Sequence, residues 1–169
     1  MVIHPPINLI SVEELERLTA LRCEEGIISL YLSARRQPPH AADRQFLFQF
    51  REGLYRFRRR TRDPIWVHAA EREKERIEDY LRWRKPVRGS LVLFSCQPAR
   101  LWEIFDIDVP VPIFLDVDST VRTWVLSDVL NQRLMDRQRD GLGAYIEGRS
   151  ERVGRAWPAG PTGVANSSS

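Results

Sequence analysis

The chain has 169 residues, of which 43% are hydrophobic and 29% are charged, and its net charge is +3. This length and composition are typical of one globular domain with enough apolar side chains to form a core. An integral membrane protein is excluded, because no apolar run approaches the roughly 18 residues of a membrane span. The first residues, MVIHPPINLI, lack the basic and apolar pattern of a secretory signal, so we expect a cytoplasmic protein.

The first elements expected along the chain are a helix and a strand. Ser11 and Glu14 have the residue types and spacing of a capping box, which predicts a helix that continues to about Leu21. The apolar run 27–33 is rich in strand-forming side chains and predicts a strand. The prolines that follow predict a loop.

Two long helices are expected next. The apolar residues of 42–61 recur at helical spacing, which predicts a helix with one buried side. Asp63 and Pro64 are typical of an N-cap and a first helical residue, and the helix they begin is expected to end at Lys85, before a proline. Charged residues of both signs alternate along this helix and predict a solvated face. They are Glu71, Arg72, Glu73, Lys74, Glu75, Arg76, Glu78, Asp79 and Arg82.

Three strands and a last helix are expected in the remainder. The apolar run 89–96 is almost continuous, as in a central strand that is covered on both faces. A tight turn separates it from an antiparallel partner over 101–107. Residues 112–117 predict another strand, and residues 120–136 predict a helix.

These elements predict an α/β fold: a small mixed β-sheet with helices packed on it, and two long helices inserted between the second and third strands. The folded domain is expected to occupy residues 1–138. Residues 139–169 are rich in glycine, proline and serine and end in PAGPTGVANSSS. Such a segment buries too little apolar surface to offset its ordering entropy, so we expect it to be disordered.

Three stretches of the chain resemble a known family. They are EGIISLYLS (25–33), LVLFSC with LWEIFDIDVPVP (91–112), and VDSTVRTWVLSDVL (117–130). Over roughly residues 20–131 the sequence resembles the N-terminal domain of the archaeal and eukaryotic class-1 peptide chain release factor superfamily, and its bacterial relatives in particular. The resemblance implies a ribosome-associated α/β domain. In true release factors this domain reads the stop codon, and a second domain with a Gly-Gly-Gln loop hydrolyses peptidyl-tRNA.

The sequence departs from this family at the functional motifs. The family's Asn-Ile-Lys-Ser motif lies between the two long helices, where this chain has Thr-Arg-Asp-Pro at 61–64. In the family's Tyr-x-Cys-x-x-x-Phe motif, Asp116 takes the place of the cysteine and Thr120 that of the closing aromatic. No Gly-Gly-Gln occurs, and residues 136–156 resemble a truncated beginning of the second domain. The expectation is a non-catalytic ribosome-binding domain without the hydrolysis domain.

The candidate functional site is an arginine-rich helix face. Residues 50–62 contain six arginines, and helical spacing places Phe48 and Tyr55 on the side that faces solvent. Arginines neutralise phosphates and aromatic rings stack on bases, so the pattern predicts binding of ribosomal RNA or tRNA. The predicted nucleic-acid-binding residues are Arg44, Arg51, Tyr55, Arg58, Arg59, Arg60 and Arg62.

Other interpretations of this face are open from the sequence. A solvated helix face has the same charge pattern if Phe48 and Tyr55 pack under a neighbouring element. The rings also suit a protein-interaction domain that binds a second copy of the chain or a separate second domain. A truncated gene product without independent function is consistent with the sequence as well.

Asp116 and Asp118 follow an apolar strand, as in phosphatases of the haloacid dehalogenase type. In such an enzyme Asp116 would attack phosphorus, Asp118 would act as acid and base, and Mg²⁺ would hold the phosphate. That chemistry also needs a downstream lysine, and no lysine follows Thr120. A phosphatase with Asp116 and Asp118 as catalytic candidates is therefore the less favoured alternative. The favoured interpretation is a domain without enzyme activity, in which Asp118 or Ser119 caps the helix that follows.

No metal or cofactor is predicted. His4, His40 and His68 have no ligand spacing with one another or with the cysteines. Cys23 and Cys96 are far apart in the sequence and outside any Cys-x-x-Cys motif. We expect both to be reduced thiols that are mostly buried.

Overall fold

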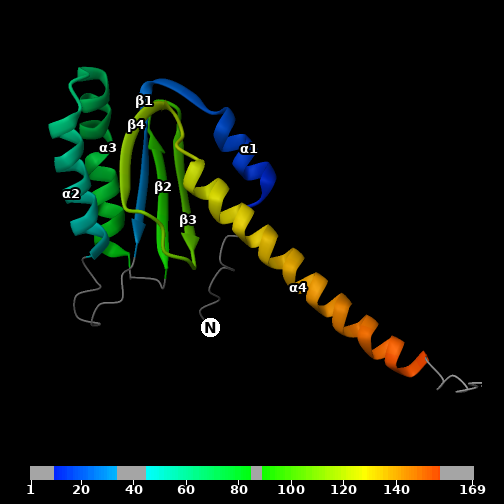
Figure 1. Ribbon diagram of the computed structural model, residues 1–169. Helices are drawn as coiled ribbons and strands as arrows, with labels where there is room; N and C mark the ends of the chain where they lie inside the picture. Colours follow the sequence, from blue (N-terminus) through cyan, green and yellow to red (C-terminus); the bar gives the residue numbers. More distant parts are fainter. Residues whose placement is uncertain (1–9, 34–44, 85–88, 157–169) are drawn as a thin grey trace, which may run out of the picture. The chain divides into compact units, whose positions relative to one another are not determined.

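The computed structural model describes residues 10–33, 45–84 and 89–156, with side chains described as far as Gly141. Four helices and four strands occur in these ranges, which confirms the α/β class (Figure 1). In chain order they are α1 (Val12–Ala20), β1 (Arg22–Ser33), α2 (Gln45–Arg60), α3 (Pro64–Trp83), β2 (Ser90–Cys96), β3 (Leu101–Ile107), β4 (Phe114–Thr120) and α4 (Trp124–Ala156).

The four strands form one sheet in the order β3-β2-β1-β4, and every neighbouring pair is antiparallel. The prediction of a mixed sheet is therefore wrong, and so is the predicted position of the long helices, because α2 and α3 connect β1 to β2. A single helix after β1 would return the chain to the end of the sheet where β1 begins, so the next strand would run parallel to β1. The two helices α2 and α3 instead bring the chain back to the end of the sheet where β1 finishes, and there Ser90 of β2 pairs with Ser33 of β1.

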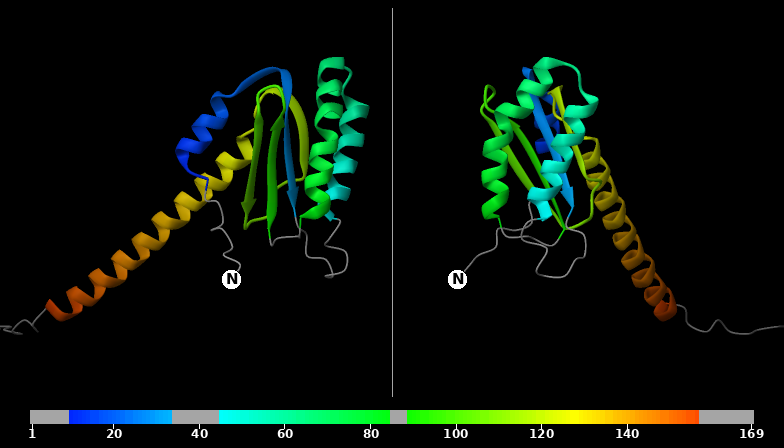
Figure 2. Two further views of the ribbon diagram at one scale, coloured as in Figure 1. Left: turned by 180° about the vertical axis from the view of Figure 1, so that it is seen from behind. Right: turned by 90° about the vertical axis from the view of Figure 1, so that its left-hand side faces the viewer.

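Helices cover both faces of the sheet. α2 and α3 lie side by side on one face (Figure 1 and Figure 2), where Leu30 of β1 belongs to one core cluster with Leu54 and Ile77. Successive strand residues point to opposite faces, so Tyr31 joins a second cluster that includes Leu18 of α1. All seven residues of β2 are buried, which confirms the predicted central strand.

The predicted helix starts are confirmed in atomic detail. Ser11 Oγ accepts a hydrogen bond from the Glu14 N–H over 3.1 Å, and the Glu14 carboxylate accepts from the Ser11 N–H over 3.1 Å. The Asp63 carboxylate accepts from the Ile65 N–H over 2.9 Å, with Pro64 as the first helical residue. Each cap satisfies backbone donors that the first helical turn leaves without an internal partner.

β1 begins earlier than predicted, at Arg22, and contains a β-bulge. Its register with β4 shifts between Arg22 and Ile27. Gly26 in this stretch has φ of +98°, a conformation that side chains with a Cβ rarely adopt. A Cβ at Gly26 would also lie 2.8 Å from the Cβ of Ala69 in α3. The glycine therefore permits both the bulge and the close approach of α3.

Replacing Gly26 by alanine is expected to lower the free energy of unfolding by about 2 kcal/mol, because a strained φ is combined with a clash against α3. Urea unfolding followed by far-UV circular dichroism measures the change. Gly141→Ala in α4 is the control, since its Cβ would meet no atom within 4 Å and alanine favours a helix. Equal losses in the two variants would contradict this role of Gly26.

The chain after β4 differs from the prediction. β4 continues to Thr120 and α4 begins at Trp124, which is later than the predicted helix start. α4 then continues to Ala156, through residues 139–156, where the glycine content predicts disorder. Alanine, arginine and glutamate between those glycines favour a helix. Residues 157–169 lie outside the described ranges.

The chain divides into two compact units, residues 1–130 and residues 131–169. The first unit holds the sheet, α1, α2, α3 and the first residues of α4. The domain boundary expected at 138 therefore falls inside α4. Within the described ranges, no helix is both long enough and apolar enough to cross a membrane.

Candidate nucleic-acid interface

The orientation of α2 is fixed by its buried side. Phe50 and Phe57 on that side are almost fully buried in the core. The buried Gln49 side chain donates to the Ser33 carbonyl oxygen over 2.7 Å and accepts from the Ser33 N–H over 3.1 Å. These two bonds join α2 to the end of β1. The opposite side of the helix is consequently held toward solvent.

The solvent side of α2 carries exposed rings and arginines around a shallow hollow of about 820 Å³. Phe48 is 66% exposed and Tyr55 is 59% exposed, which argues against the interpretation that they pack under a neighbouring element. The hollow, here called the α2 hollow, is lined by Phe48, Arg51, Glu52, Tyr55, Arg56, Arg59 and Arg60. Four arginines and one glutamate give this lining a net charge of +3.

Arg59 and Tyr55 form a contact at the centre of this face. The guanidinium carbon of Arg59 lies 5.6 Å from the centre of the Tyr55 ring, and its NH1 donates to the Tyr55 hydroxyl over 3.3 Å. Arg59 has no carboxylate partner in the described part of the chain. A positive charge and an exposed ring are thus presented together, as binding of a phosphate and a base requires.

Other arginines of α2 form ion pairs with carboxylates. Arg51 Nε lies 3.3 Å from Glu78 of α3, and Arg58 pairs with Glu71, which is also in α3. The side chains of Arg51 and Arg58 are 55% and 39% exposed, but the side chain of Glu78 is only 14% exposed. The Arg58–Glu71 pair is exposed on both sides and contributes only about 0–1 kcal/mol, so a phosphate can replace Glu71 at little cost. Separating Arg51 from the mostly buried Glu78 costs more. These pairs lower the effective charge of the face without blocking it.

The structure brings together part of the predicted binding set. Arg51, Tyr55, Arg59 and Arg60 line the α2 hollow. Arg58 does not, because its side chain turns toward Glu71 on α3. Arg62 follows α2, is exposed, and has no ion pair with any described residue. Arg44 lies outside the described ranges.

Two polar residues of the hollow, Glu52 and Arg56, are absent from the predicted set. They form an ion pair at i,i+4 spacing on the solvent side of the helix. The same helical spacing that places Tyr55 outward also places these two beside it, so the signal was in the sequence. The predicted set includes Arg58, which pairs with α3 and does not line the hollow, and Arg51, which lines the hollow and also pairs with α3.

Asp116 and Asp118 form a structural ion-pair cluster. Arg122 Nε donates to Asp116 over 3.0 Å, and Arg122 NH2 donates to Asp118 over 2.6 Å. Arg60 also lies 3.5 Å from Asp116. Asp118 accepts from the Ser119 N–H and not from the start of α4, so the predicted helix cap is wrong. The described residues include no group of three or more side chains able to hold a metal ion.

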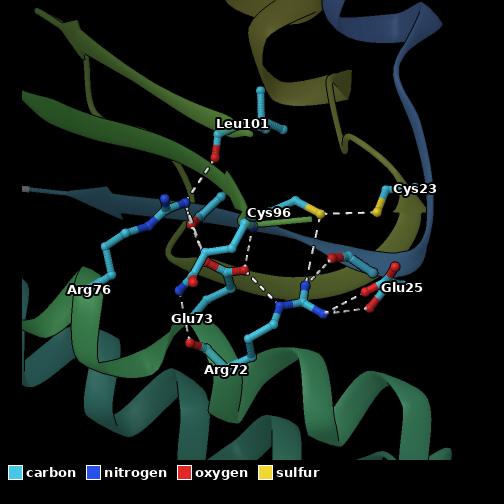
Figure 3. Close-up of polar contacts among 10 residues, drawn as sticks. Cys23, Glu25, Arg72, Glu73, Arg76, Cys96 and Leu101 are labelled. Carbon is cyan, nitrogen blue, oxygen red and sulfur yellow. Dashed lines mark hydrogen bonds and ion pairs between the residues drawn. The ribbon is translucent and has the colours of Figure 1, made fainter. Parts of the chain in front are cut away.

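A buried ion-pair network lies between α3 and the sheet (Figure 3). Its central residue is Glu73, which the alternating charges along this helix predict to face solvent. Glu73 has no exposed surface. One carboxylate oxygen accepts from Arg72 Nε over 2.9 Å and from the Gln97 N–H over 2.7 Å. The other accepts from the Ser95 hydroxyl over 2.7 Å and lies 3.3 Å from the Arg76 guanidinium. The prediction of a solvated face is therefore wrong at Glu73, because donors from α3 and the end of β2 satisfy the buried carboxylate.

Opposing effects act on the pKa of Glu73. Burial by itself raises this pKa, because it disfavours the charged form. Hydrogen bonds from Gln97, Ser95 and Arg72, with the charge of Arg76, outweigh burial and lower the pKa below its ordinary value. Glu73 is therefore ionised at neutral pH and fully engaged by donors. This network supports the packing of α3 on β2 and leaves no carboxylate oxygen free for chemistry.

No protein-family model matches this sequence, and no curated protein is similar to it. One solved structure, described as an archaeal protein, is similar over 72% of this chain, with 21% sequence identity and a TM-score of 0.47. The chain spans 36% of the length of that protein. A likeness of this degree carries no argument about function.

Proposed function

We propose that this chain is a non-catalytic RNA-binding domain and that the α2 hollow is its binding surface. The observation that carries the proposal is the pair of exposed rings, Phe48 and Tyr55, within a lining of net charge +3. Apolar rings of this size on a surface are otherwise costly to leave in water. The resemblance of residues 20–131 to release factor domains supports ribosomal RNA or tRNA as the class of ligand, in a factor of the translation termination or ribosome rescue type.

The spacing of the rings favours a single-stranded segment. Phe48 and Tyr55 are seven residues apart, so they lie two helical turns, or roughly 10 Å, apart along the α2 axis. Stacked bases follow one another at about 3.4 Å, and a duplex hides their faces. Two rings at this spacing suit separate, unstacked bases of an extended strand. Arg51, Arg56 and Arg59 then neutralise the phosphates between them.

A protein-interaction domain is the second candidate, because Tyr and Arg are enriched at protein interfaces. The charge of the α2 hollow restricts the partner. A symmetric dimer through this face would place two surfaces of net charge +3 opposite each other, which is unfavourable. A protein partner of this face would therefore need acidic side chains.

Ribosome pelleting with the purified chain tests the proposed function. We expect the protein to sediment with ribosomes at low salt and to be released steeply as salt rises, because phosphate contacts release counterions. Fluorescence anisotropy titrations with a single-stranded RNA and with a duplex of equal length show which form of RNA the chain prefers. We expect the single strand to bind more tightly. Protein that stays in the supernatant at low salt and binds neither RNA would overturn the proposal.

A further inference from the structure

The two cysteines of the chain lie in contact although 73 positions separate them in the sequence (Figure 3). Cys96 Sγ donates to Cys23 Sγ over 3.0 Å, and both are free thiols. Cys23 lies near the start of β1, and Cys96 is the last residue of β2. The prediction that the thiols are reduced and mostly buried holds for Cys96, whereas Cys23 is only half-buried.

The geometry permits a bond between the two sulfurs. A disulfide has a sulfur–sulfur distance of about 2.05 Å, so the atoms need to approach by about 1 Å. Cys23 precedes the bulge at Gly26, in a stretch where the register between β1 and β4 shifts. No regular ladder with β4 fixes this stretch, so a small shift of Cys23 does not break the central part of the sheet.

The two thiols differ in access. Cys96 has no exposed surface, and burial raises its pKa to about 11, which keeps it protonated at neutral pH. Cys23 is partly exposed and accepts the hydrogen bond from Cys96. Arg72 NH2 lies 3.8 Å from Cys96 Sγ and donates to the Gly26 carbonyl oxygen over 3.0 Å. Cys23 is thus the sulfur that a solution oxidant meets first, and the positive charge of Arg72 lies beside the sulfur of its partner, Cys96.

We propose that Cys23 and Cys96 are an oxidation site, at which a hydroperoxide oxidises Cys23 and Cys96 then closes an intramolecular disulfide. In the first step the Cys23 thiolate attacks a peroxide oxygen, the O–O bond breaks, and Cys23 sulfenic acid and hydroxide form. In the second step Cys96 sulfur attacks Cys23 sulfur, the S–O bond breaks, and hydroxide leaves with the Cys96 proton as water. The hydroxide of the first step takes up the proton that Cys23 released on forming its thiolate. The two sulfurs together lose two electrons, and hydrogen peroxide is reduced to two molecules of water.

The disulfide has a measurable consequence for stability. It would close a long loop that contains α2 and α3, and so would restrict the unfolded chain much more than the folded one. The midpoint of thermal unfolding is expected to rise by more than about 5 °C. This inference does not depend on RNA binding, because the α2 hollow contains neither cysteine.

Treating the reduced full chain with hydrogen peroxide tests the proposal. Peptide mapping without reductant is expected to give a Cys23–Cys96 linked peptide and a protein mass lower by two hydrogens, reversed by dithiothreitol. Cys96→Ala is expected to stop at Cys23 sulfenic acid, trapped by dimedone, because the second thiol is missing. Cys23→Ser is expected to leave Cys96 unoxidised and open to alkylation only after denaturation.

Several results would overturn the proposal. These are two thiols that remain free after treatment, oxidation of Cys96 in the Cys23→Ser variant, or a disulfide-linked dimer in place of the intramolecular bond. Cys96 lies in the core, so Cys96→Ala is first compared with the wild type by urea unfolding. If that variant does not fold, the peptide map of the wild-type chain decides the question by itself.

Discussion

Replacing Tyr55 by alanine is expected to weaken binding of single-stranded RNA about tenfold. The substitution removes an exposed stacking platform and the ring against which Arg59 lies. Because Tyr55 is 59% exposed, the free energy of unfolding is expected to change by less than about 0.5 kcal/mol. Fluorescence anisotropy titration at fixed salt measures the affinity, and urea unfolding measures the stability.

Matched variants separate stacking from charge in this prediction. Tyr55→Phe keeps the ring and loses only the hydroxyl that accepts from Arg59, so its affinity is expected to stay within about twofold of the wild type. Arg59→Gln is expected to lower the slope of log affinity against log salt by about one. Arg17→Gln removes one charge on α1, away from the α2 hollow, and is expected to leave the slope unchanged. Equal affinities for the wild type and Tyr55→Ala would contradict the stacking role.

The sequence predicts those features of the fold that depend on neighbouring residues. The capping box of Ser11 and Glu14 and the cap at Asp63 each involve residues within one helical turn, and the structure confirms them. The outward direction of Phe48 and Tyr55 follows from the helical period in the same way. Such signals need no knowledge of which elements pack together.

Features that depend on packing between elements are not predictable in this way. The pairing of Arg58 with Glu71 requires that α2 and α3 lie side by side, and the charge pattern of either helix alone does not show it. The contact of Cys23 with Cys96 requires the sheet order and the bulge at Gly26. A one-residue change in strand register would direct Cys96 to the other face. The exposure of Phe48 and Tyr55 is therefore predictable from the sequence, whereas the ion pairs of the neighbouring arginines are not, and RNA binding by this face stays a prediction.

Replacing Glu73 by glutamine is expected to lower the free energy of unfolding at neutral pH by about 3 kcal/mol. The neutral side chain leaves the guanidinium groups of Arg72 and Arg76 without their buried counter-charge. It also turns an amide group toward donors that need an acceptor. Glu75→Gln is the control, because Glu75 lies on the same helix and is exposed. A change below about 0.5 kcal/mol is expected there.

Measuring the free energies of unfolding of the wild type and of Glu73→Gln at several pH values tests whether Glu73 is ionised in the folded chain. Its pKa in the folded chain is lowered from the ordinary 4.5, so the unfolded chain binds the proton more readily. The stability that Glu73 contributes is therefore fully present above about pH 4.5 and is lost as the pH falls through the folded-state pKa. We expect the difference in unfolding free energy between wild type and Glu73→Gln to be constant from pH 5 to pH 8, roughly, and to shrink below this range. A difference that stays constant down to acid unfolding would show that glutamine disturbs packing alone, and that the charge of Glu73 does not hold α3 to β2.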